Sequence, residues 1–418
     1  MPESIKKGTF LNLVAYGLSG IFLFIFKIIT ARSLGKEAFG IISVFLASIW
    51  IISRLLTTGI KDSATRYISL HEATEDRKGM SRVFLENLKY TIIVILFFLF
   101  LSLSLFKILS LQLFSGFLTL YILFVLSCIL YFVLFFLRGV LQGLRELKDS
   151  AVSVIVEYFT MLLALVAFFS FAKDVRFAAL SILLAPLCSL LYILSTISKH
   201  RKRFSNQPSQ VPTTRTLLRF VIPTSFVNFS SGFITQLGPP FIKIVSNFSL
   251  AGVFTASLDI FKAARTALTA LFISIFPHLS RQEALKNKKR LHVMIRDGLI
   301  FVLTVSVIMV VVSITFGQRI VEFFYGEKFV IARVHLLLMS LFTSFFLLSE
   351  LFNRILLAKS MLKALSFSWV CAIMILIGLL FLPCSPLIRA EVALLGAAIT
   401  AFCGMIISLM VSKTSKDV

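Results

Sequence analysis

Two arginines lie alone in long apolar segments, at positions where a charge is costly to bury. Arg54 occurs in segment 38–60 and Arg265 in segment 250–275, and neither has an acidic residue three or four positions away. A charge near the centre of a membrane-spanning helix costs at least a few kcal/mol, so such residues usually face a bundle interior or a water-filled cavity. A guanidinium group stays charged when it is desolvated and binds two phosphate oxygens at once. This pair therefore predicts a site for an anionic, phosphate-bearing substrate.

Segment 250–275 carries further polar residues in a helical pattern. Asp259, Lys262, Thr266 and Thr269 recur at steps of three and four, which places a polar stripe on one face of a helix. Such a stripe in a membrane helix lines water or polar protein rather than lipid. Burial of the whole stripe against polar partners, and local pairing of Asp259 with Lys262, are the alternatives.

Two other charges fall at membrane depth in the first half of the chain. Lys27 either faces the interior or extends to the membrane surface near Arg32, which lies five residues further on. Glu157 lies about two turns inside segment 150–172 and either binds an ion or neutralises a neighbouring cation. Near the end of segment 331–353, by contrast, we expect a local ion pair because an acidic and a basic residue are four positions apart. That pair is Glu350 and Arg354.

Cations outnumber acids at this depth, so we expect a cationic cavity. A transporter of cationic drugs should instead show unpaired acidic residues there. The residues expected to bind the anionic substrate are Lys27, Arg54, Lys262 and Arg265. The candidates for binding a coupling ion are Asp259 and Glu157.

The elements that position these residues are a dozen apolar segments, each long enough to cross a bilayer. The hydrocarbon core is about 30 Å thick and needs about 20 mostly apolar residues. The chain is 58% hydrophobic and 15% charged, with a mean hydropathy of +0.97, a composition that excludes a soluble protein. We predict an all-α polytopic membrane protein with about twelve transmembrane helices. The expected spans are residues 9–32, 38–60, 84–107, 113–137, 150–172, 177–198, 216–242, 250–275, 294–317, 331–353, 362–383 and 391–411.

The net charge of +23 is a topology signal rather than a sign of nucleic-acid binding. About 27 of the 42 Lys and Arg residues fall on the connections that lie inside when both termini are cytoplasmic. The apolar run after Lys6 and Lys7 continues without a signal-peptide cleavage pattern, so we interpret it as a retained first span. The predicted location is the cell membrane, with both termini in the cytoplasm. We expect membrane lipids as neighbours and no nucleic-acid partner.

A polar segment divides the chain near its midpoint. Residues 199–215 are basic and contain Pro, Ser and Gln, which is typical of a linker. We therefore predict two six-helix lobes, residues 1–204 and 205–418. Aligning Gly40 with Gly252 places the two lone arginines at offsets of 14 and 13 residues, which indicates a parallel internal repeat.

The sequence shows no arrangement of catalytic or metal-binding residues. The five cysteines lie in or at the ends of apolar spans, without a CxxC pair, and the five histidines lie near span ends. Walker and GxSxG motifs are absent from the sequence. We expect no cofactor, no metal and no enzymatic activity. Close helix packing explains the GxxxG pattern at Gly139–Gly143.

Four segments resemble those of polysaccharide-exporting flippases. They are Ile29–Ser69, Phe136–Asp149 (FLRGVLQGLRELKD), Arg219–Phe226 (RFVIPTSF) and Ile275–Arg281 (IFPHLSR). In the first, the pattern is leucine-glycine, an acidic residue, aromatic-glycine, a long helix, glycine and a basic residue. The matching positions are Leu34, Gly35, Glu37, Phe39, Gly40, Gly59 and Arg66. The family is the oligosaccharide flippase branch of the multidrug/oligosaccharidyl-lipid/polysaccharide exporter superfamily.

The resemblance implies a fold and a function. It implies two six-helix lobes around a central cavity that opens alternately to each side, whose cations hold a lipid-linked diphosphate. The cargo would be an oligosaccharide on undecaprenyl or dolichyl diphosphate, moved from the inner to the outer leaflet. Glycosyltransferases or a glycan polymerase would be partners. The lipid II branch usually carries about two more spans, which makes a peptidoglycan precursor a less expected cargo.

Two alternatives stay open. A cation-coupled multidrug antiporter of the same superfamily would depend on its acidic residues rather than on Arg54 and Arg265. A membrane glycan polymerase or glycosyltransferase is less expected, because such an enzyme would more plausibly carry a large outer loop with acid/base residues, and the outer connections here are short.

Overall fold

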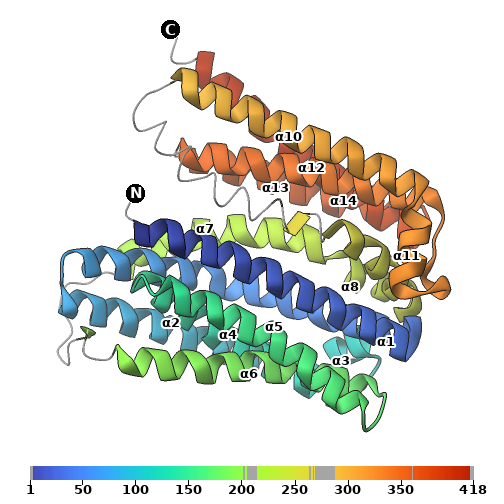
Figure 1. Ribbon diagram of the computed structural model, residues 1–418, viewed down its shortest axis with the longest axis horizontal. Helices are drawn as coiled ribbons and strands as arrows, with labels where there is room; N and C mark the ends of the chain where they lie inside the picture. Colours follow the sequence, from blue (N-terminus) through green and yellow to red (C-terminus); the bar gives the residue numbers. More distant parts are fainter. Residues whose placement is uncertain are drawn as a thin grey trace. The chain divides into compact units, whose positions relative to one another are not determined.

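The structure is a computed structural model that describes residues 3–200, 203–204, 214–262, 265, 266, 268, 288–359 and 361–414. The regular secondary structure of these residues is helical (Figure 1), which confirms the predicted all-α class. The predicted features that lie outside the described residues include Thr269, most of the 199–215 linker and the Ile275–Arg281 motif.

The first two predicted spans form one long element with a sharp break. Helix α1 runs from Glu3 to Ala73, and Gly35 interrupts it with φ 79° and ψ 179°. A positive φ is inexpensive only for glycine, and the chain doubles back at this point (Figure 1). The second predicted span was too short, because the helix continues from residue 60 to Ala73. Hydropathy marks where the apolar stretch ends, whereas a helix can continue into water on backbone hydrogen bonds alone.

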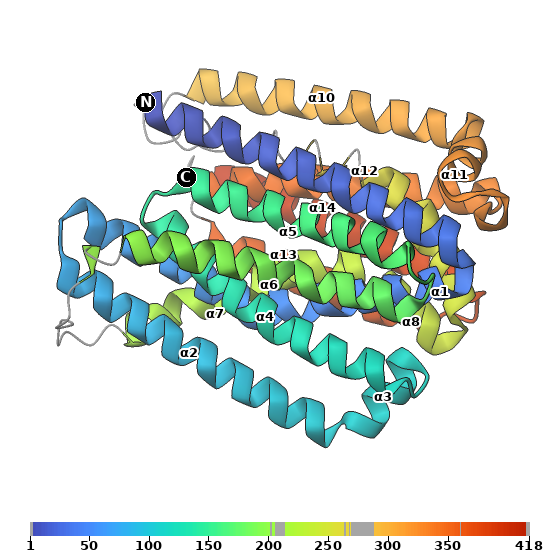
Figure 2. The ribbon, with the colours of Figure 1, turned by 60° about the horizontal axis from the view of Figure 1, so that its bottom comes forward.

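Five further helices precede the linker. They are α2 (Arg77–Ser104), α3 (Phe106–Phe114), α4 (Leu118–Gly143), α5 (Leu147–Phe169) and α6 (Val175–Lys199). Helices α3 and α4 are joined by a turn that lies inside the predicted span 113–137. There Ser115 and Gly116 take left-handed conformations with φ 51° and 83°. Helix α6 packs beside both α4 and α5 (Figure 2).

The remaining helices follow the linker. They are α7 (Thr214–Gln236), α8 (Gly238–Val245), a helix over residues 248–262, α10 (Lys288–Thr315), α11 (Gly317–Tyr325), the 3-10 turn η2 (Glu327–Phe329), α12 (Arg333–Ala358), α13 (Leu362–Leu379) and α14 (Pro386–Thr414). The predicted span 216–242 is wrong as one helix, because it is interrupted at Leu237. Pro239 and Pro240 have no amide hydrogen to donate, so a new helix begins there with proline in its first turn.

The chain forms two compact units. Unit 1 comprises Met1–Leu34 and Val44–Gly232, and unit 2 comprises Gly35–Ser43 and Phe233–Val418. These bounds differ from the predicted lobes 1–204 and 205–418, and the division into two six-helix lobes stays a prediction. Aromatic side chains fill each interior. In unit 1 the ring of Phe45 lies 5.9 Å from that of Phe114, and in unit 2 Phe346 lies 6.3 Å from Trp369.

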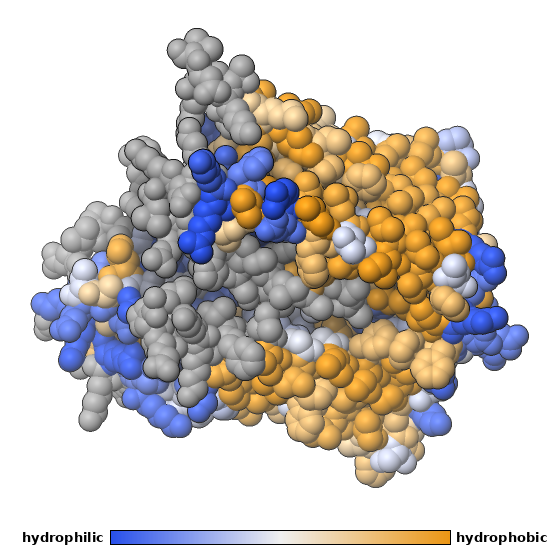
Figure 3. Space-filling model, turned by 45° about the horizontal axis from the view of Figure 1, so that its top comes forward, coloured by the Kyte–Doolittle hydropathy of each residue, from blue (hydrophilic) through white to orange (hydrophobic). Residues whose placement is uncertain are grey.

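The outer surface of the helices is apolar. Large hydrophobic side chains are exposed along α2, α10 and α13, among them Leu103, Val307 and Met374. Figure 3 shows hydrophobic residues across the middle of the face drawn and hydrophilic ones toward its two ends. Nine helices in the described ranges are long and apolar enough to cross a membrane, with the broken α1 counted once. A multi-pass membrane protein is therefore confirmed, while the number of twelve spans and the cytoplasmic termini stay predictions.

Candidate functional site

Arg54 lies in the second part of α1 and packs against both an aromatic ring and a glycine. Its guanidinium carbon lies 5.5 Å from the centre of the Trp50 ring. A Cβ atom on Gly232 of α7 would come within 2.6 Å of Cδ of Arg54 and 2.9 Å of its Nη1. Because Gly232 has no side chain, the arginine lies directly against the α7 backbone. Trp50 and Gly232 therefore fix the position of Arg54 within unit 1.

Arg265 of unit 2 has a similar aromatic support. Its guanidinium carbon lies 5.3 Å from the centre of the Phe346 ring on α12. A guanidinium group that lies over a ring face can still donate hydrogen bonds from its N–H groups. Both arginines thus lie over an aromatic ring. The ring beside Arg54 is four residues earlier in the same helix, whereas the ring beside Arg265 is on another helix.

The polar stripe of unit 2 contains a local ion pair. Nζ of Lys262 lies 3.5 Å from Oδ1 of Asp259, and the two side chains are 16% and 3% exposed. The alternative that Asp259 pairs with Lys262 is therefore the arrangement found. The Thr266 hydroxyl donates to the Lys262 backbone carbonyl at 2.8 Å. Lys27, the remaining expected cation, is partly buried in the first part of α1, in unit 1.

Glu157 is fully buried beside a cation that sequence reasoning missed. Nη2 of Arg138 lies 2.6 Å from Oε2 of Glu157, and the side chains are 6% and 0% exposed. The Tyr131 hydroxyl donates to the other carboxylate oxygen at 2.9 Å. Arg138 also donates to the Ser153 hydroxyl and carbonyl at 3.0 Å and to the Ser189 hydroxyl at 3.2 Å.

The position of Arg138 explains why it was missed. We predicted that the fourth span ends at residue 137 and that Arg138 begins an inner connection. The structure contradicts this, because α4 continues to Gly143 and buries Arg138. The continuation has a steric reason: a Cβ on Gly139 would lie 2.5 Å from the Lys61 carbonyl oxygen, so only glycine permits this close packing against α1. Packing as the role of the GxxxG pattern is thereby confirmed.

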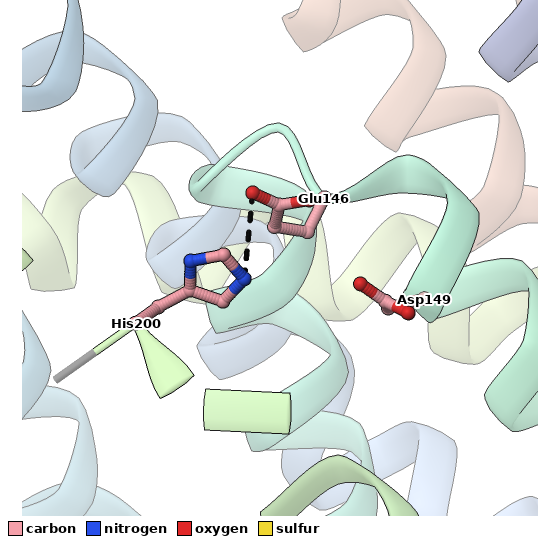
Figure 4. A group of neighbouring side chains, drawn as sticks. All are labelled: Glu146, Asp149 and His200. Carbon is pink, nitrogen blue, oxygen red and sulfur yellow. Dashed lines mark ion pairs between the residues drawn. The ribbon is translucent and has the colours of Figure 1, made fainter. Parts of the chain in front are cut away.

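Two groups of charges lie outside this set. The expected ion pair between Glu350 and Arg354 is confirmed, with 3.8 Å between the charged atoms. The second group, Glu146, Asp149 and His200, has possible metal-ligand atoms within 4.8 Å of one another (Figure 4).

That cluster is already engaged in ion pairs and hydrogen bonds within unit 1. Oε1 of Glu146 lies 3.0 Å from the Arg203 guanidinium and 3.5 Å from Nε2 of His200. Asp149 accepts a hydrogen bond from the Tyr192 hydroxyl at 2.8 Å. A guanidinium on a ligand oxygen opposes a divalent cation there, so the cluster connects the α4–α5 turn to the end of α6.

A cavity of about 240 Å³ lies in unit 2, between the helix over 248–262 and helices α10, α11 and α12. Its walls are almost entirely apolar, so it suits hydrocarbon rather than phosphate. The lining residues include Ile260, Phe261, Val305, Met309, Ile320 and Leu336.

The sequence matches a known protein family. A family described as "Polysaccharide biosynthesis protein" matches residues 5–283, well over half of the 418 residues. The chain belongs to the polysaccharide biosynthesis protein family. This family match confirms the resemblance to polysaccharide flippases within the multidrug/oligosaccharidyl-lipid/polysaccharide exporter superfamily.

Alignments with a relative and with solved structures cover nearly all of the chain. Stage V sporulation protein B of Bacillus subtilis (strain 168) is 21% identical over 431 residues, which cover 97% of this chain and 82% of that protein. A multidrug resistance MATE family transporter of the MOP superfamily, solved in an inward-facing conformation, matches with a TM-score of 0.72, 14% identity and coverage of 97% and 98% of the two chains.

A MOP superfamily transporter from Pyrococcus furiosus, reported with reversed polarity of its binding pocket, has a TM-score of 0.66, 13% identity and coverage of 98% and 95%. These likenesses establish the fold of this polysaccharide biosynthesis family member. Together with the family match, they support a multi-pass protein of the plasma membrane.

Proposed function

We propose that this protein is a flippase that moves an oligosaccharide linked to a lipid diphosphate from the inner to the outer leaflet. Transport would proceed by alternating access, in the assembly of a cell-surface polysaccharide or glycan. The observation that carries the proposal is the aromatic-supported arginine that occurs in a predicted span of each unit. Arg54 lies over Trp50, and Arg265 lies over Phe346.

The chemistry follows from the guanidinium group. A diphosphate offers several oxygens with two negative charges, and a guanidinium donates two parallel N–H bonds to such a group. Ring stacking holds the guanidinium plane and lowers the entropy lost on binding. Lys27 and Lys262 would contribute further positive charge as flexible point charges. In this proposal these four cations bind the diphosphate of the substrate.

The transported charge suggests a driving force. Moving one charge across the membrane is worth about 2.3 kcal/mol per 100 mV, so outward transfer of two negative charges gains about 4–5 kcal/mol. Cavity cations that travel with the cargo would cancel part of this gain, and an ion carried inward would then restore it. Asp259 and Glu157 are the proposed carboxylates for such an ion. Each would have to exchange its basic partner, Lys262 or Arg138, for that ion.

The test follows a fluorescent lipid-diphosphate-linked oligosaccharide in proteoliposomes. We expect Arg54→Gln and Arg265→Gln each to reduce the flipping rate at least tenfold, and Lys at either position to restore part of it. Arg319→Gln is the matched control, because it removes an exposed arginine from the first turn of α11. Flipping by the Arg54→Gln, Arg265→Gln double variant at the wild-type rate would overturn the proposal.

The same vesicles test a second candidate, which the likeness to a multidrug resistance transporter favours. A multidrug antiporter would export a cationic dye, would lose this activity with Asp259→Asn or Glu157→Gln, and would keep it without Arg54 and Arg265. In the flippase assay, rates that do not respond to a potassium diffusion potential or to sodium and proton gradients would indicate passive flipping.

A further inference from the structure

Unit 2 contains a buried glutamate whose charged-group partner is a histidine. Nδ1 of His335 lies 2.8 Å from Oε2 of Glu391 and 3.1 Å from Oε1. The glutamate side chain is 0% exposed and the histidine side chain is 15% exposed. His335 is the third residue of α12 and Glu391 is the sixth residue of α14, so the pair lies near the beginning of both helices.

The ion pairs of the other buried acids in the described part of the chain have a different kind of partner. Glu86 pairs with Arg82, Glu157 with Arg138, Asp259 with Lys262 and Glu350 with Arg354. Each of those carboxylates faces a lysine or an arginine, whose charge is permanent near neutral pH. Glu391 instead faces an imidazole, a group whose charge is not permanent.

The helices packed against this pair bring their other charges to different partners. Arg333 on α12 donates to the Gln318 side chain, Arg389 on α14 donates to the Cys384 carbonyl, and Lys243 on α8 lies over the Phe248 ring. The remaining charged residues on the packed helices are Glu350 and Arg354 on α12, Arg319 and Glu322 on α11, Lys363 at the beginning of α13 and Lys413 at the far end of α14.

Helix α10 keeps its charges at the far end. All of its charged residues and its histidine lie within residues 288–297, in its first three turns. The Ser313 hydroxyl, near the other end of α10, donates to the Ser340 hydroxyl of α12 at 3.2 Å, so the two helices run in opposite directions. The charged end of α10 therefore lies away from His335.

A fully buried carboxylate without a fixed cation is costly in its charged form. One neutral imidazole supplies one N–H donor to two carboxylate oxygens, which satisfies only part of the charge. Adding one proton to the pair changes its net charge from −1 to 0 and forms either a carboxylic acid or an imidazolium–carboxylate pair. The binding of a proton thus removes the unfavourable charge without any movement of the helices.

We propose that Glu391 and His335 form a proton-binding site in unit 2. The ring nitrogen disfavours sodium, because hard cations take oxygen ligands. As a coupling site for transport, the pair rests on the proposed function. The predicted topology assigns the beginning of α12 and α14 to the outer side, so the proton would enter from the outer medium and supply the inward charge of the return step.

The first test detects proton binding directly and needs no transport. The purified full chain is titrated in lipid nanodiscs, and infrared difference spectra follow the C=O band of protonated carboxyl groups. We expect a protonated carboxyl band whose intensity changes with pH. This band should be lost in Glu391→Gln and retained in Glu322→Gln, which removes an exposed glutamate of α11. The same titration in Glu391→Gln as in the wild type would overturn the site.

A second variant keeps the test decisive if Glu391→Gln does not fold. His335→Gln retains the carboxyl and should shift the midpoint of its band by changing the hydrogen bond that it receives. An unchanged midpoint in His335→Gln contradicts the pair as a unit. A midpoint that depends on sodium concentration contradicts selectivity for the proton.

A transport assay distinguishes proton binding at this site from a role of the site in coupling. In proteoliposomes, the flipping rate should depend on external pH in the wild type and in Glu322→Gln, and this dependence should be lost in Glu391→Gln. A titrating Glu391 carboxyl in a protein that does not flip the lipid-linked oligosaccharide supports the site and rejects the proposed function. A titrating carboxyl with flipping that does not depend on pH rejects the coupling role.

Discussion

Gly40 and Gly252 lie back to back where two helices of unit 2 cross. A Cβ atom on Gly40 would overlap the carbonyl oxygen of Phe248 and lie 3.1 Å from the Gly252 nitrogen. A Cβ on Gly252 would overlap the Lys36 carbonyl oxygen and lie 3.0 Å from the Gly40 nitrogen. These are the two glycines that the proposed internal repeat aligns, and each occurs about four turns before a lone arginine.

Alanine at either glycine should therefore destabilise the protein. We expect Gly40→Ala and Gly252→Ala each to lower the free energy of unfolding by about 1–3 kcal/mol, because backbone atoms would have to separate. Thermal unfolding of the purified protein, followed through the reactivity of its free cysteines, measures the change. Gly378→Ala is the matched control, because a Cβ there meets nothing within 4 Å and alanine favours helix. Equal melting temperatures for all three variants would contradict the crossing.

Removing one member of the buried Arg138–Glu157 pair should be strongly destabilising. Glu157→Gln leaves a buried guanidinium without its counter-charge, and breaking such a pair costs about 3–5 kcal/mol. Replacing both residues, as Arg138→Met with Glu157→Leu, should recover most of that loss, because apolar side chains of similar volume need no counter-charge.

The same variants distinguish a structural from an ion-coupling role for Glu157. In a structural role, the double variant restores both stability and flipping. In a coupling role, it restores stability alone, and the response of flipping to an ion gradient is lost. A Glu157→Gln variant as stable as the wild type would show that the pair contributes little to folding.

The stability of the first turn of α2 should decrease at acidic pH. Oδ1 of Asp76 accepts a hydrogen bond from the Gly79 amide at 2.9 Å, and Oδ2 lies 2.9 Å from Nδ1 of His71. The Gly79 bond, aided by the charge of His71, holds the pKa of Asp76 below its ordinary value of 3.8. Since the folded-state pKa is depressed, the cap stabilises the helix above about pH 4, and this contribution is lost as the pH falls through the folded-state value.

Amide hydrogen exchange at Gly79 and Met80 measures this cap. Asp76→Ala should speed exchange about fivefold at neutral pH, which corresponds to about 1 kcal/mol for the loss of an N-cap. Asp76→Asn keeps an accepting oxygen but does not titrate, so it should keep protection at neutral pH and abolish the acid dependence. Acid dependence that persists in Asp76→Asn would assign the effect to another group.

The predicted topology can be tested by cysteine labelling. Single cysteines at Ser205 and Ser385 in a cysteine-free background should react from opposite sides of the membrane, because the loop charges place the linker inside. Ser385 is exposed before α14, whereas Ser205 lies outside the described residues. Reaction of the Ser205→Cys variant with an impermeant reagent in intact cells would show that the orientation is opposite to the predicted one.

The sequence by itself determined the class of protein and its most unusual charges. Long apolar segments without charged residues predict membrane helices. In lipid no water is present to bond the backbone N–H and C=O groups, and a helix satisfies these groups within one segment. The lone arginines stand out for the same reason, since a charge in that setting needs a function or a partner. Contacts at fixed helical steps were predictable too: the expected pair of Glu350 with Arg354 is found, and so is the pair of Asp259 with Lys262 that was one of the alternatives.

The tertiary structure decided which distant residues meet. Arg138 and Glu157 are 19 positions apart and His335 and Glu391 are 56 apart. No local period connects such pairs; helix length and packing bring them together. Helix α4 continues through Arg138, whose guanidinium meets α5 and α6, and Glu391 meets His335 because α12 and α14 pack side by side. Contacts between helices depend on how their surfaces fit, and that fit is fixed by the folded backbone rather than by spacing along the chain.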